Sequence, residues 1–341
     1  MPPDPRSAEE RASRRRATRT KKFVGLLTCC VAIVIGVAIA VAVVQPWATG
    51  ATQPTQPMRY LGLHEPDAPG SYTGVNEFAR AVGKQPNLVS YYSPWPKPFQ
   101  VGYANLAAKH GALTLIQMDP TNVSLATIAN GRYDLYLRTF ATAVKLFRAR
   151  IVLSFGHEMN GDWYSWGYQH TPPRVFVAAW RHIVNVFRSA GAENVTWLWT
   201  VNVVVKDLPI HIPDPAPWWP GRSYVDWVGI DGYYYMPHSS FAQIFGPTIV
   251  AVRALTRDPI LIAETGAAMA AGQPAKINDL FLGIHAYGLL GFLWFDENVQ
   301  GRAWRINSSQ AFAMFRRDAK TFLRPSATPA SQHSSSNSPS P

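Results

Sequence analysis

Two glutamates at the ends of apolar runs are the residues of this sequence best suited to acid–base chemistry. Glu158 comes shortly after the apolar residues 151–153, and Glu264 directly follows residues 260–263. Short continuous apolar runs are typical of buried parallel strands, and the polar residues after such a strand lie in a functional loop. Two carboxyl groups held together in different protonation states have the chemistry needed to break a glycosidic bond.

The residues around Glu158 exclude a zinc protease motif. That motif needs a second histidine four positions after the first, and Gly161 stands at that position after His157. Cys29 and Cys30 are the only cysteines and both lie in an N-terminal apolar segment, so the globular part has no disulfide and no thiolate metal site. We therefore expect a site with no metal ion and no other cofactor.

A longer pattern surrounds Glu158. It reads His-Glu-Met-Asn-Gly at residues 157–161, Trp-Tyr at 163–164 and Trp-Gly at 166–167. Two further patterns follow along the chain, at residues 224–233 and 262–266. Together they resemble glycoside hydrolase family 26, whose best-known members are endo-β-mannanases. The resemblance covers roughly residues 59–320.

The resemblance implies a role for each residue of the site. Glu158 is the acid/base and Glu264 the nucleophile, which implies retention of the anomeric configuration and a carboxyl separation of about 5 to 5.5 Å. His157 would orient a carboxylate or a sugar hydroxyl, with a buried structural histidine as the alternative. Tyr233 resembles the tyrosine that donates a hydrogen bond to the nucleophile, although the two tyrosines after it compete for this assignment.

Several tryptophans are candidates for binding sugar rings. Trp294, in the apolar run 291–295, occupies the position where the family has an aromatic platform, and Trp163 and Trp166 lie in the loop after the first glutamate. Flat apolar rings fit the CH faces of a pyranose. With the tryptophans at 218–219, these rings would surround an open groove, which favours cleavage inside a polymer.

The sequence departs from the family pattern at Ser154. The family often has arginine there, so a positive charge near the carboxylates is either absent or supplied elsewhere, with Arg302 and Arg305 as candidates. Three further polar residues lie at predicted strand ends and are candidates for the cleft, with capping or salt bridging as the alternative: His64, Glu65 and Asp119.

The elements that must position these residues alternate regularly. Strand-like runs begin near residues 59, 87, 113, 151, 195, 226, 259 and 291, about 33 residues apart, which is the length of one strand with its crossover helix. The segments between them show helical periodicity, as at residues 136–147 and 176–187. Eight such units predict a (β/α)8 TIM barrel rather than an open doubly wound sheet. No GxGxxG, P-loop or GxSxG motif occurs, which argues against nucleotide binding and serine-hydrolase chemistry.

The chain outside the barrel has a different composition. Residues 23–44 are uncharged and would form about 33 Å of helix, enough to cross a bilayer. The basic residues before them should remain cytoplasmic, which places the barrel outside the plasma membrane. A cleaved signal peptide is the alternative, and the protein would then be secreted. The predicted segments are a cytoplasmic tail at 1–22, a transmembrane anchor at 23–45, a linker at 46–57, the barrel at 58–324 and a disordered Ser/Pro-rich tail at 325–341.

The formal net charge of +11 is partly an effect of the N-terminal tail. Residues 1–22 hold eight basic and three acidic side chains, which leaves +6 for the rest. No basic cluster with interleaved aromatic residues suggests nucleic-acid binding. We expect a monomer that binds a polysaccharide and cleaves it internally, most simply β-1,4-mannan. A β-1,3- or mixed-linkage β-glucanase and a noncatalytic polysaccharide-binding barrel are the alternatives.

Overall fold

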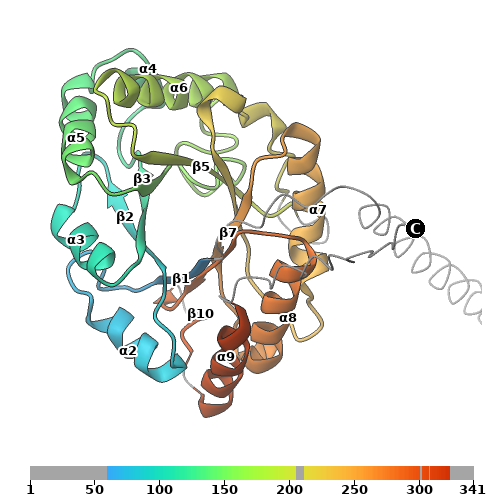
Figure 1. Cartoon of the computed structure of the whole chain (residues 1–341). Coiled ribbons are helices and arrows are strands. Elements are labelled where there is room, and N and C mark those ends of the chain that lie inside the picture. Colours follow the sequence, from blue (N-terminus) through green and yellow to red (C-terminus); the bar gives the residue numbers. More distant parts are fainter. Residues whose placement is uncertain (1–59, 205–210, 300–301, 307, 323–341) are drawn as a thin grey trace, which may run out of the picture. The chain divides into compact units, whose positions relative to one another are not determined.

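A closed barrel of eight parallel strands forms the centre of this computed structural model, which describes residues 60–204, 211–299, 302–306 and 308–322. The strands follow one another in chain order, and β1 also pairs with β8, which closes the barrel (Figure 1). The strands are β1 Tyr60–His64, β2 Leu88–Pro94, β3 Leu113–Asp119, β4 Ile151–Phe155, β5 Val195–Asn202, β6 Trp227–Asp231, β7 Ile260–Thr265 and β8 Gly291–Phe295. The predicted (β/α)8 barrel is confirmed.

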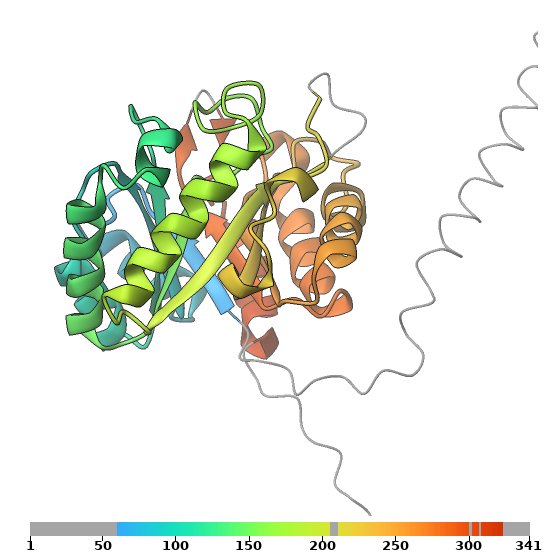
Figure 2. The same cartoon turned by 90° about the horizontal axis from the view of Figure 1, so that it is seen from above.

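Helices surround the outer face of the barrel (Figures 1 and 2). The α-helices are α2 Thr73–Val82, α3 Val101–Lys109, α4 Leu125–Ala129, α5 Asp134–Phe147, α6 Pro173–Ser189, α7 Phe241–Leu255, α8 Gln273–Ala286 and α9 Ser309–Phe322. Shorter elements are the 3-10 turns η2 Ala216–Trp218, η3 Arg222–Tyr224 and η4 Met269–Ala271 and the hairpin β9 Asn298–Val299 with β10 Arg302–Ala303.

The helices form where apolar residues recur at helical spacing. In α6 the buried residues include Phe176, Trp180 and Ile183, which share one face, and a proline occupies the first turn, where its missing N–H costs nothing. The buried residues of α5 include Phe140 and Val144, again on a single face. Each helix therefore packs one apolar stripe against the barrel.

The hydrophobic core has two layers, because successive strand residues point to opposite faces of the sheet. On β8, Leu293 belongs to the small cluster inside the barrel, whereas Phe292 and Trp294 belong to the large cluster between strands and helices. On β5, Leu198 points inward and Trp199 outward in the same way. This alternation decides which residues at the strand ends face the barrel mouth.

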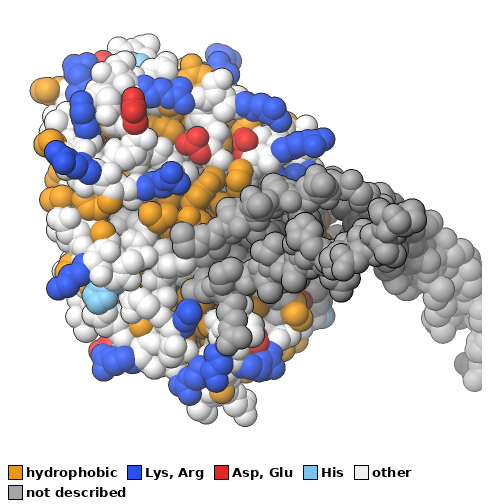
Figure 3. Space-filling model, viewed as in Figure 1, with side chains coloured by type: hydrophobic (Ala, Val, Ile, Leu, Met, Phe, Trp, Pro, Cys, Tyr) orange, Lys and Arg blue, Asp and Glu red, His pale blue; other side chains and the backbone are white. Residues whose placement is uncertain are grey.

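The N-terminal tail at 1–22, the anchor at 23–45, the linker at 46–57 and the tail at 325–341 lie outside the described residues. Among the helices that the structure does describe, none is both long enough and apolar enough to span a bilayer. On the face shown in Figure 3, Lys and Arg side chains lie in several separate places rather than in one patch.

Candidate active site

Glu158 reaches the barrel mouth through a turn that begins where β4 ends. Gly156 and Glu158 both have φ near 54°, in the left-handed region. This conformation is uncommon for a residue with a side chain, and here the backbone N–H of Glu158 donates to the carbonyl of Thr200 at 3.0 Å. A Cβ on Gly156 would lie 3.2 Å from the rings of Phe176 and Trp166, so glycine suits this position.

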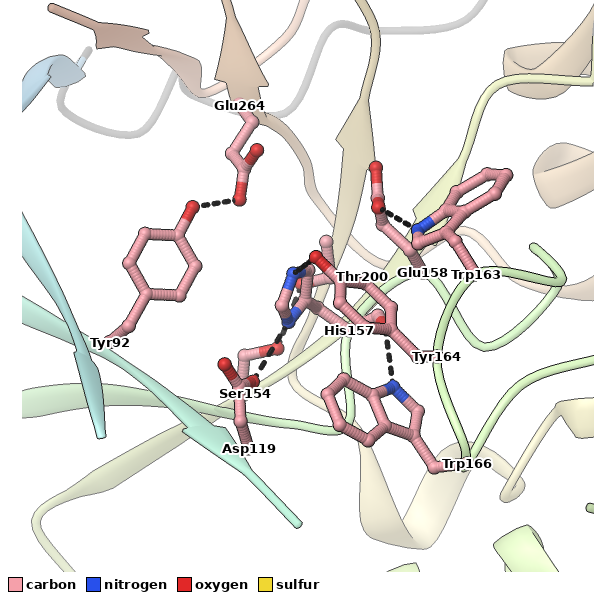
Figure 4. A network of polar contacts seen from close by, with 10 residues as sticks. All are labelled: Tyr92, Asp119, Ser154, His157, Glu158, Trp163, Tyr164, Trp166, Thr200 and Glu264. Carbon is pink, nitrogen blue, oxygen red and sulfur yellow. Dashed lines mark hydrogen bonds and ion pairs between the residues drawn. The ribbon is translucent and has the colours of Figure 1, made fainter. Parts of the chain in front are cut away.

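The Glu158 carboxyl accepts two hydrogen bonds from N–H donors. The indole of Trp163 donates to Oε2 at 2.7 Å, and the amide of Asn202, at the end of β5, donates to Oε1 (Figure 4 shows the indole contact). A Cβ on Gly161 would lie 2.3 Å from the indole ring, so glycine gives Trp163 room to fold back over the loop. Asn160 accepts from the backbone N–H of Asn202 at 2.8 Å and donates to its carbonyl at 2.9 Å, which fixes the end of β5.

The surroundings of Glu158 favour the neutral acid. Burial raises its pKa to about 7, and the negative charge of Glu264 acts in the same direction. The charge of His157 and the hydrogen bonds from Asn202 and Trp163 oppose this rise without cancelling it. A carboxyl group with such a pKa is able to donate a proton near neutral pH.

Glu264, on β7, is held by two phenols. Tyr233 donates to Oε2 at 2.7 Å, and Tyr92 at the end of β2 donates to Oε1 (Figure 4 shows Tyr92). Burial, followed by the charge of Glu264, raises the pKa of both tyrosines well above the ordinary value, so both phenols keep their protons. The expected contact of Tyr233 with Glu264 is present. Tyr234 is fully buried, and Tyr235 lies beneath the guanidinium of Arg302.

A β-bulge turns Glu264 toward the barrel mouth. Leu261 and Ala263 belong to the inner cluster, so Glu264 would face the helices in a regular strand. The register between β6 and β7 shifts at this point, and Asp231 pairs with Glu264. A bulge of this kind re-aims a side chain and is frequent beside active sites.

Three carboxyl groups meet at the mouth. One oxygen from each of Glu158, Asp231 and Glu264 lies within 4.8 Å of the others. Burial, followed by the charges of the two glutamates, raises the pKa of Asp231 well above its usual range. The three oxygens are close enough to hold a hard cation. Protonation also reduces the negative charge of the cluster. The raised pKa values of Asp231 and Glu158 favour the neutral form of each carboxyl group.

His157 lies beneath this cluster and is 2% exposed. Its Nδ1 lies 2.9 Å from Asp119, at the end of β3, and its Nε2 lies 3.2 Å from the hydroxyl of Tyr164 (Figure 4). Burial opposes the charged form, but the charge and the hydrogen bond of Asp119 outweigh it and raise the pKa of His157 to about 9. His157 thus acts on the carboxyl groups as a buried positive charge. No hydrogen bond joins it to either glutamate among the described residues.

The two other polar candidates lie at the end of β1. His64 contacts Ser90 and Glu297, each at 3.3 Å, and its ring stacks on Phe295. Burial, followed by the charge of Asp296, raises the pKa of Glu65 to about 7. His64 therefore joins the inner wall beside Tyr92, whereas Glu65 forms part of a separate acidic group.

The expectation for Trp294 is wrong. This side chain is fully buried and packs against Phe315 of α9, because an even step along β8 from Phe292 places it on the outer face. The next residue, Phe295, faces the site and packs against His64 and Tyr233. Phe295 therefore occupies the place where a platform was expected.

The other tryptophans divide between the cleft and the core. Trp163 is 40% exposed beside Glu158, as expected of a ring that a sugar can reach. Trp166 is 3% exposed, stacks on Tyr164 and donates to the carbonyl of His157, so it supports the loop and the expectation of a sugar contact is wrong. Trp218 is 2% exposed and also offers no platform.

Neither candidate arginine supplies the positive charge that Ser154 lacks. The Ser154 hydroxyl lies 3.0 Å from that of Thr200 inside the barrel. Arg302 packs over Tyr235, and Arg305 lies 3.7 Å from Asp296. Neither arginine pairs with a site glutamate, so neither replaces the family arginine.

Comparison with known proteins adds to this geometry. Residues 120–276 match the model of glycosyl hydrolase family 26. The barrel is a glycoside hydrolase family 26 domain. The resemblance seen in the motifs is thereby confirmed.

Curated relatives of this family 26 domain have different names. The chain is similar to Endoglucanase H of Acetivibrio thermocellus, with 32% identity over 263 residues, 72% of this chain and 29% of that protein. A β-1,3-xylanase of Vibrio sp. is 25% identical over 48% of this chain and 36% of its own length. A mannan endo-1,4-β-mannosidase of Caldalkalibacillus mannanilyticus is 32% identical over 24% of this chain and 16% of its own length. The chain thus spans about a third or less of these relatives.

Solved structures share the fold. A β-mannanase of this family from Bacteroides ovatus is 15% identical, with a TM-score of 0.56 over 78% of this chain and 89% of that chain. The catalytic domain of an endo-β-1,4-mannanase from Bacillus sp. has the same identity, with a TM-score of 0.58 over 79% and 87% of the two chains. At this identity the likeness concerns the barrel alone.

Proposed function

We propose that the chain is a retaining, endo-acting β-glycoside hydrolase. The observation that carries the proposal is the pairing of Glu158 and Glu264, whose nearest carboxyl oxygens lie within 4.8 Å. This separation resembles the carboxyl spacing of about 5 to 5.5 Å in retaining enzymes more than the wider spacing of about 6.5 to 9.5 Å in inverting ones. Glu158 accepts hydrogen bonds from an indole and an amide, whereas Glu264 accepts them from two phenols. This difference supports a division into acid and nucleophile.

The proposed reaction has two displacements. In the first, a Glu264 oxygen forms a bond to the anomeric carbon while the glycosidic bond breaks, and the Glu158 proton passes to the leaving oxygen. In the second, water attacks the same carbon, Glu158 takes its proton, and the bond to Glu264 breaks. Each displacement inverts the carbon, so the β-configuration is retained.

β-1,4-Mannan is the first candidate polymer, because the motifs around the two glutamates resemble those of β-mannanases. A β-glucan is the second candidate. It is supported by the relative named an endoglucanase, which matches 72% of the chain, whereas the mannosidase matches 24% at the same identity. The exposed ring of Trp163 beside Glu158 is the described surface best suited to a sugar next to the cleaved bond.

The test uses the full chain, purified in detergent, with mannan, lichenan, curdlan and xylan as separate substrates. Short oligosaccharides should appear before monosaccharide, and NMR of the first product should show the β-anomer. An α-anomer at early times would rule out retention. Depolymerisation of a β-glucan with mannan left intact selects the second candidate. Binding of a polymer without cleavage would support the noncatalytic alternative.

The proposed location is the outer face of the plasma membrane, with residues 23–45 as the anchor. The support is the uncharged run preceded by eight basic residues within residues 1–22. Protease added to intact cells should digest the barrel and leave the N-terminal tail protected. A barrel that is cut only after lysis would reverse this orientation, and a mature chain that begins after the run would indicate a signal peptide.

A further inference from the structure

Glu264 is unusual in the kind of donors that hold it. Each of its two oxygens accepts a hydrogen bond from one phenol. The donors are Tyr92 on β2 and Tyr233 after β6. Within the described ranges, no Arg or Lys side chain forms an ion pair with this glutamate. The nearby cation is His157, and it is already paired with Asp119. The orientation of Glu264 therefore depends on two neutral hydroxyl groups.

Tyr92 is built into the inner wall of the barrel. It follows Leu88 and Ser90 at steps of two along β2, so its side chain points inward while that of Tyr91 points toward the helices. Its ring packs edge-on against His64, with centroids 4.9 Å apart, and lies 5.6 Å from the ring of His157. These contacts from β1 and from the loop after β4 fix the direction of the hydroxyl.

We propose that Tyr92 is a positioning residue for the nucleophile: its hydroxyl fixes one oxygen of Glu264 so that the other is presented to the anomeric carbon. This inference rests on the proposed function. Nothing in the motifs around residues 157–167 or 262–266 marks Tyr92, which lies on a strand outside both. The assignment follows from its contact with Glu264 and from the rings that hold it.

The proposal has a consequence for catalysis. As Glu264 bonds to carbon its negative charge disappears, and a neutral donor loses less interaction energy in that step than a cation would. Tyr92 should therefore act mainly on the direction of attack and on the ionised form of Glu264, which accepts its hydrogen bond. The titratable groups that interact electrostatically with Glu264 in the described structure are Tyr92, Tyr233, Glu158, Asp231, His157, Tyr164 and Tyr235.

Tyr92→Phe tests the proposal, with Tyr91→Phe as its matched control. Tyr91 is the preceding residue, is fully buried, and contacts the backbone N–H of Gln100 through its hydroxyl, away from the mouth. The probes are 2,4-dinitrophenyl β-mannobioside and β-cellobioside for turnover, and their 2-deoxy-2-fluoro analogues for covalent labelling of the enzyme. Turnover is measured from pH 4 to 9, and labelling is followed by mass spectrometry.

The Tyr92→Phe variant should be labelled about 10- to 100-fold more slowly, the effect of losing one hydrogen bond to a charged group. KM should change little. The acid limb of kcat/KM should move to higher pH, because the ionised nucleophile loses a donor. Tyr91→Phe should leave the labelling rate and the acid limb unchanged. A Tyr92→Phe enzyme that matches Tyr91→Phe in both readouts overturns the proposal, as does slower labelling with an unmoved acid limb.

A second substitution covers the case in which Tyr92→Phe does not fold. Replacing Tyr92 by 3-fluorotyrosine keeps the ring in place and makes the hydroxyl a stronger donor, so the acid limb should move to lower pH. An unmoved limb in that enzyme overturns the proposal. The wild-type chain separates this result from the proposed function. If wild type is neither labelled nor active on any substrate, the proposed function fails and the role of Tyr92 fails with it. If wild type is active, the results for the Tyr92 variants alone decide whether Tyr92 positions the nucleophile.

Discussion

The ends of β4 and β7 present the same residue type in different surroundings. Glu158 leaves its strand through a left-handed turn and accepts hydrogen bonds from an indole and an amide. Glu264 remains within its strand, is turned inward by a bulge, and accepts hydrogen bonds from two phenols. The neighbouring strands and loops, rather than the glutamates themselves, therefore assign the two roles.

The supporting residues also differ in origin. The loop after β4 carries Trp163 and Asn160, so much of the Glu158 environment lies within a few residues of it in sequence. The partners of Glu264 come from β2 and from the residues after β6, far away in the chain. A local motif therefore describes one half of the site, whereas the other half exists only in the closed barrel.

The largest expected effect comes from removing the β7 carboxylate. Glu264→Ala should lower kcat by at least about 10⁴-fold on every substrate, because no covalent intermediate forms. Labelling by the fluorinated probe should disappear. The exposed Glu193 offers a matched control, and Glu193→Ala should retain full activity. Labelling that persists in Glu264→Ala would assign the nucleophile to another residue.

Removal of the β4 carboxyl should be more selective. Glu158→Ala should lose about 10²- to 10⁴-fold on a polysaccharide, whose leaving group needs a proton. On a dinitrophenyl glycoside the loss in the first displacement should be small, because this leaving group departs without a proton. Pre-steady-state release of dinitrophenol measures that step directly. Equal losses on both substrates would end the distinction between the two glutamates.

Counting residues along each strand would have found parts of the site that the motifs missed. The innermost cluster contains Leu88, Leu198 and Leu293. Steps of two from these residues toward the strand ends lead to Tyr92, Asn202 and Phe295, and all three face the mouth. None of the three was predicted from sequence, although the strands that carry them were.

Such counting would also have corrected the assignment of Trp294, but it would have misplaced Glu264. Trp294 was assigned to the cleft because it occupies the position where the family has an aromatic platform, but it follows the inward-facing Leu293 and packs on α9 instead. Counted in steps of two along β7, Glu264 would face the helices. A bulge turns it toward the barrel mouth, and no residue in the sequence marks that bulge. The barrel, the strand ends, both glutamates and Tyr233 were thus accessible from periodicity and motifs, whereas Tyr92, the other partner of Glu264, required the positions of residues along β2.

A third prediction concerns the stability that the folded chain loses when the buried Glu158 carboxyl becomes ionised. The folded-state pKa of Glu158 is raised from 4.5 to about 7, so between these values the folded chain binds more protons than the unfolded one. The contribution of Glu158 to stability is therefore fully present below pH 4.5 and is lost as pH rises through about 7. Glu158→Gln stays neutral and should be more stable than wild type by about 1 to 3 kcal/mol at pH 8, with little difference at pH 4.

Chemical denaturation of the two proteins at both pH values measures this difference. Glu193→Gln, at an exposed position, is the control and should match wild type at each pH. If the Glu158→Gln chain shows no gain at pH 8, the carboxyl is ionised in the folded protein at little cost. The contrast between the two glutamates would then rest on hydrogen bonding alone.

The mildest substitution removes one of the two hydrogen-bond donors to Glu158. Asn202→Ala removes an amide that stabilises the charged form of Glu158, so the pKa of Glu158 should rise above about 7 and the alkaline limb of kcat/KM should move to higher pH. Activity at pH 6 should fall about 3- to 10-fold, because the carboxyl loses one of two donors that orient it.

Asn194→Ala is the matched control for this last change. Asn194 also donates through its amide, but to the carbonyls of Val144 and Ala149, and its loss should leave the pH profile unchanged. Trp163→Phe should shift the alkaline limb in the same direction as Asn202→Ala, because the indole N–H is the other donor. If both variants leave the limb in place, the proton that controls it belongs to a different group, and His157, with its pKa near 9, is the next residue to replace.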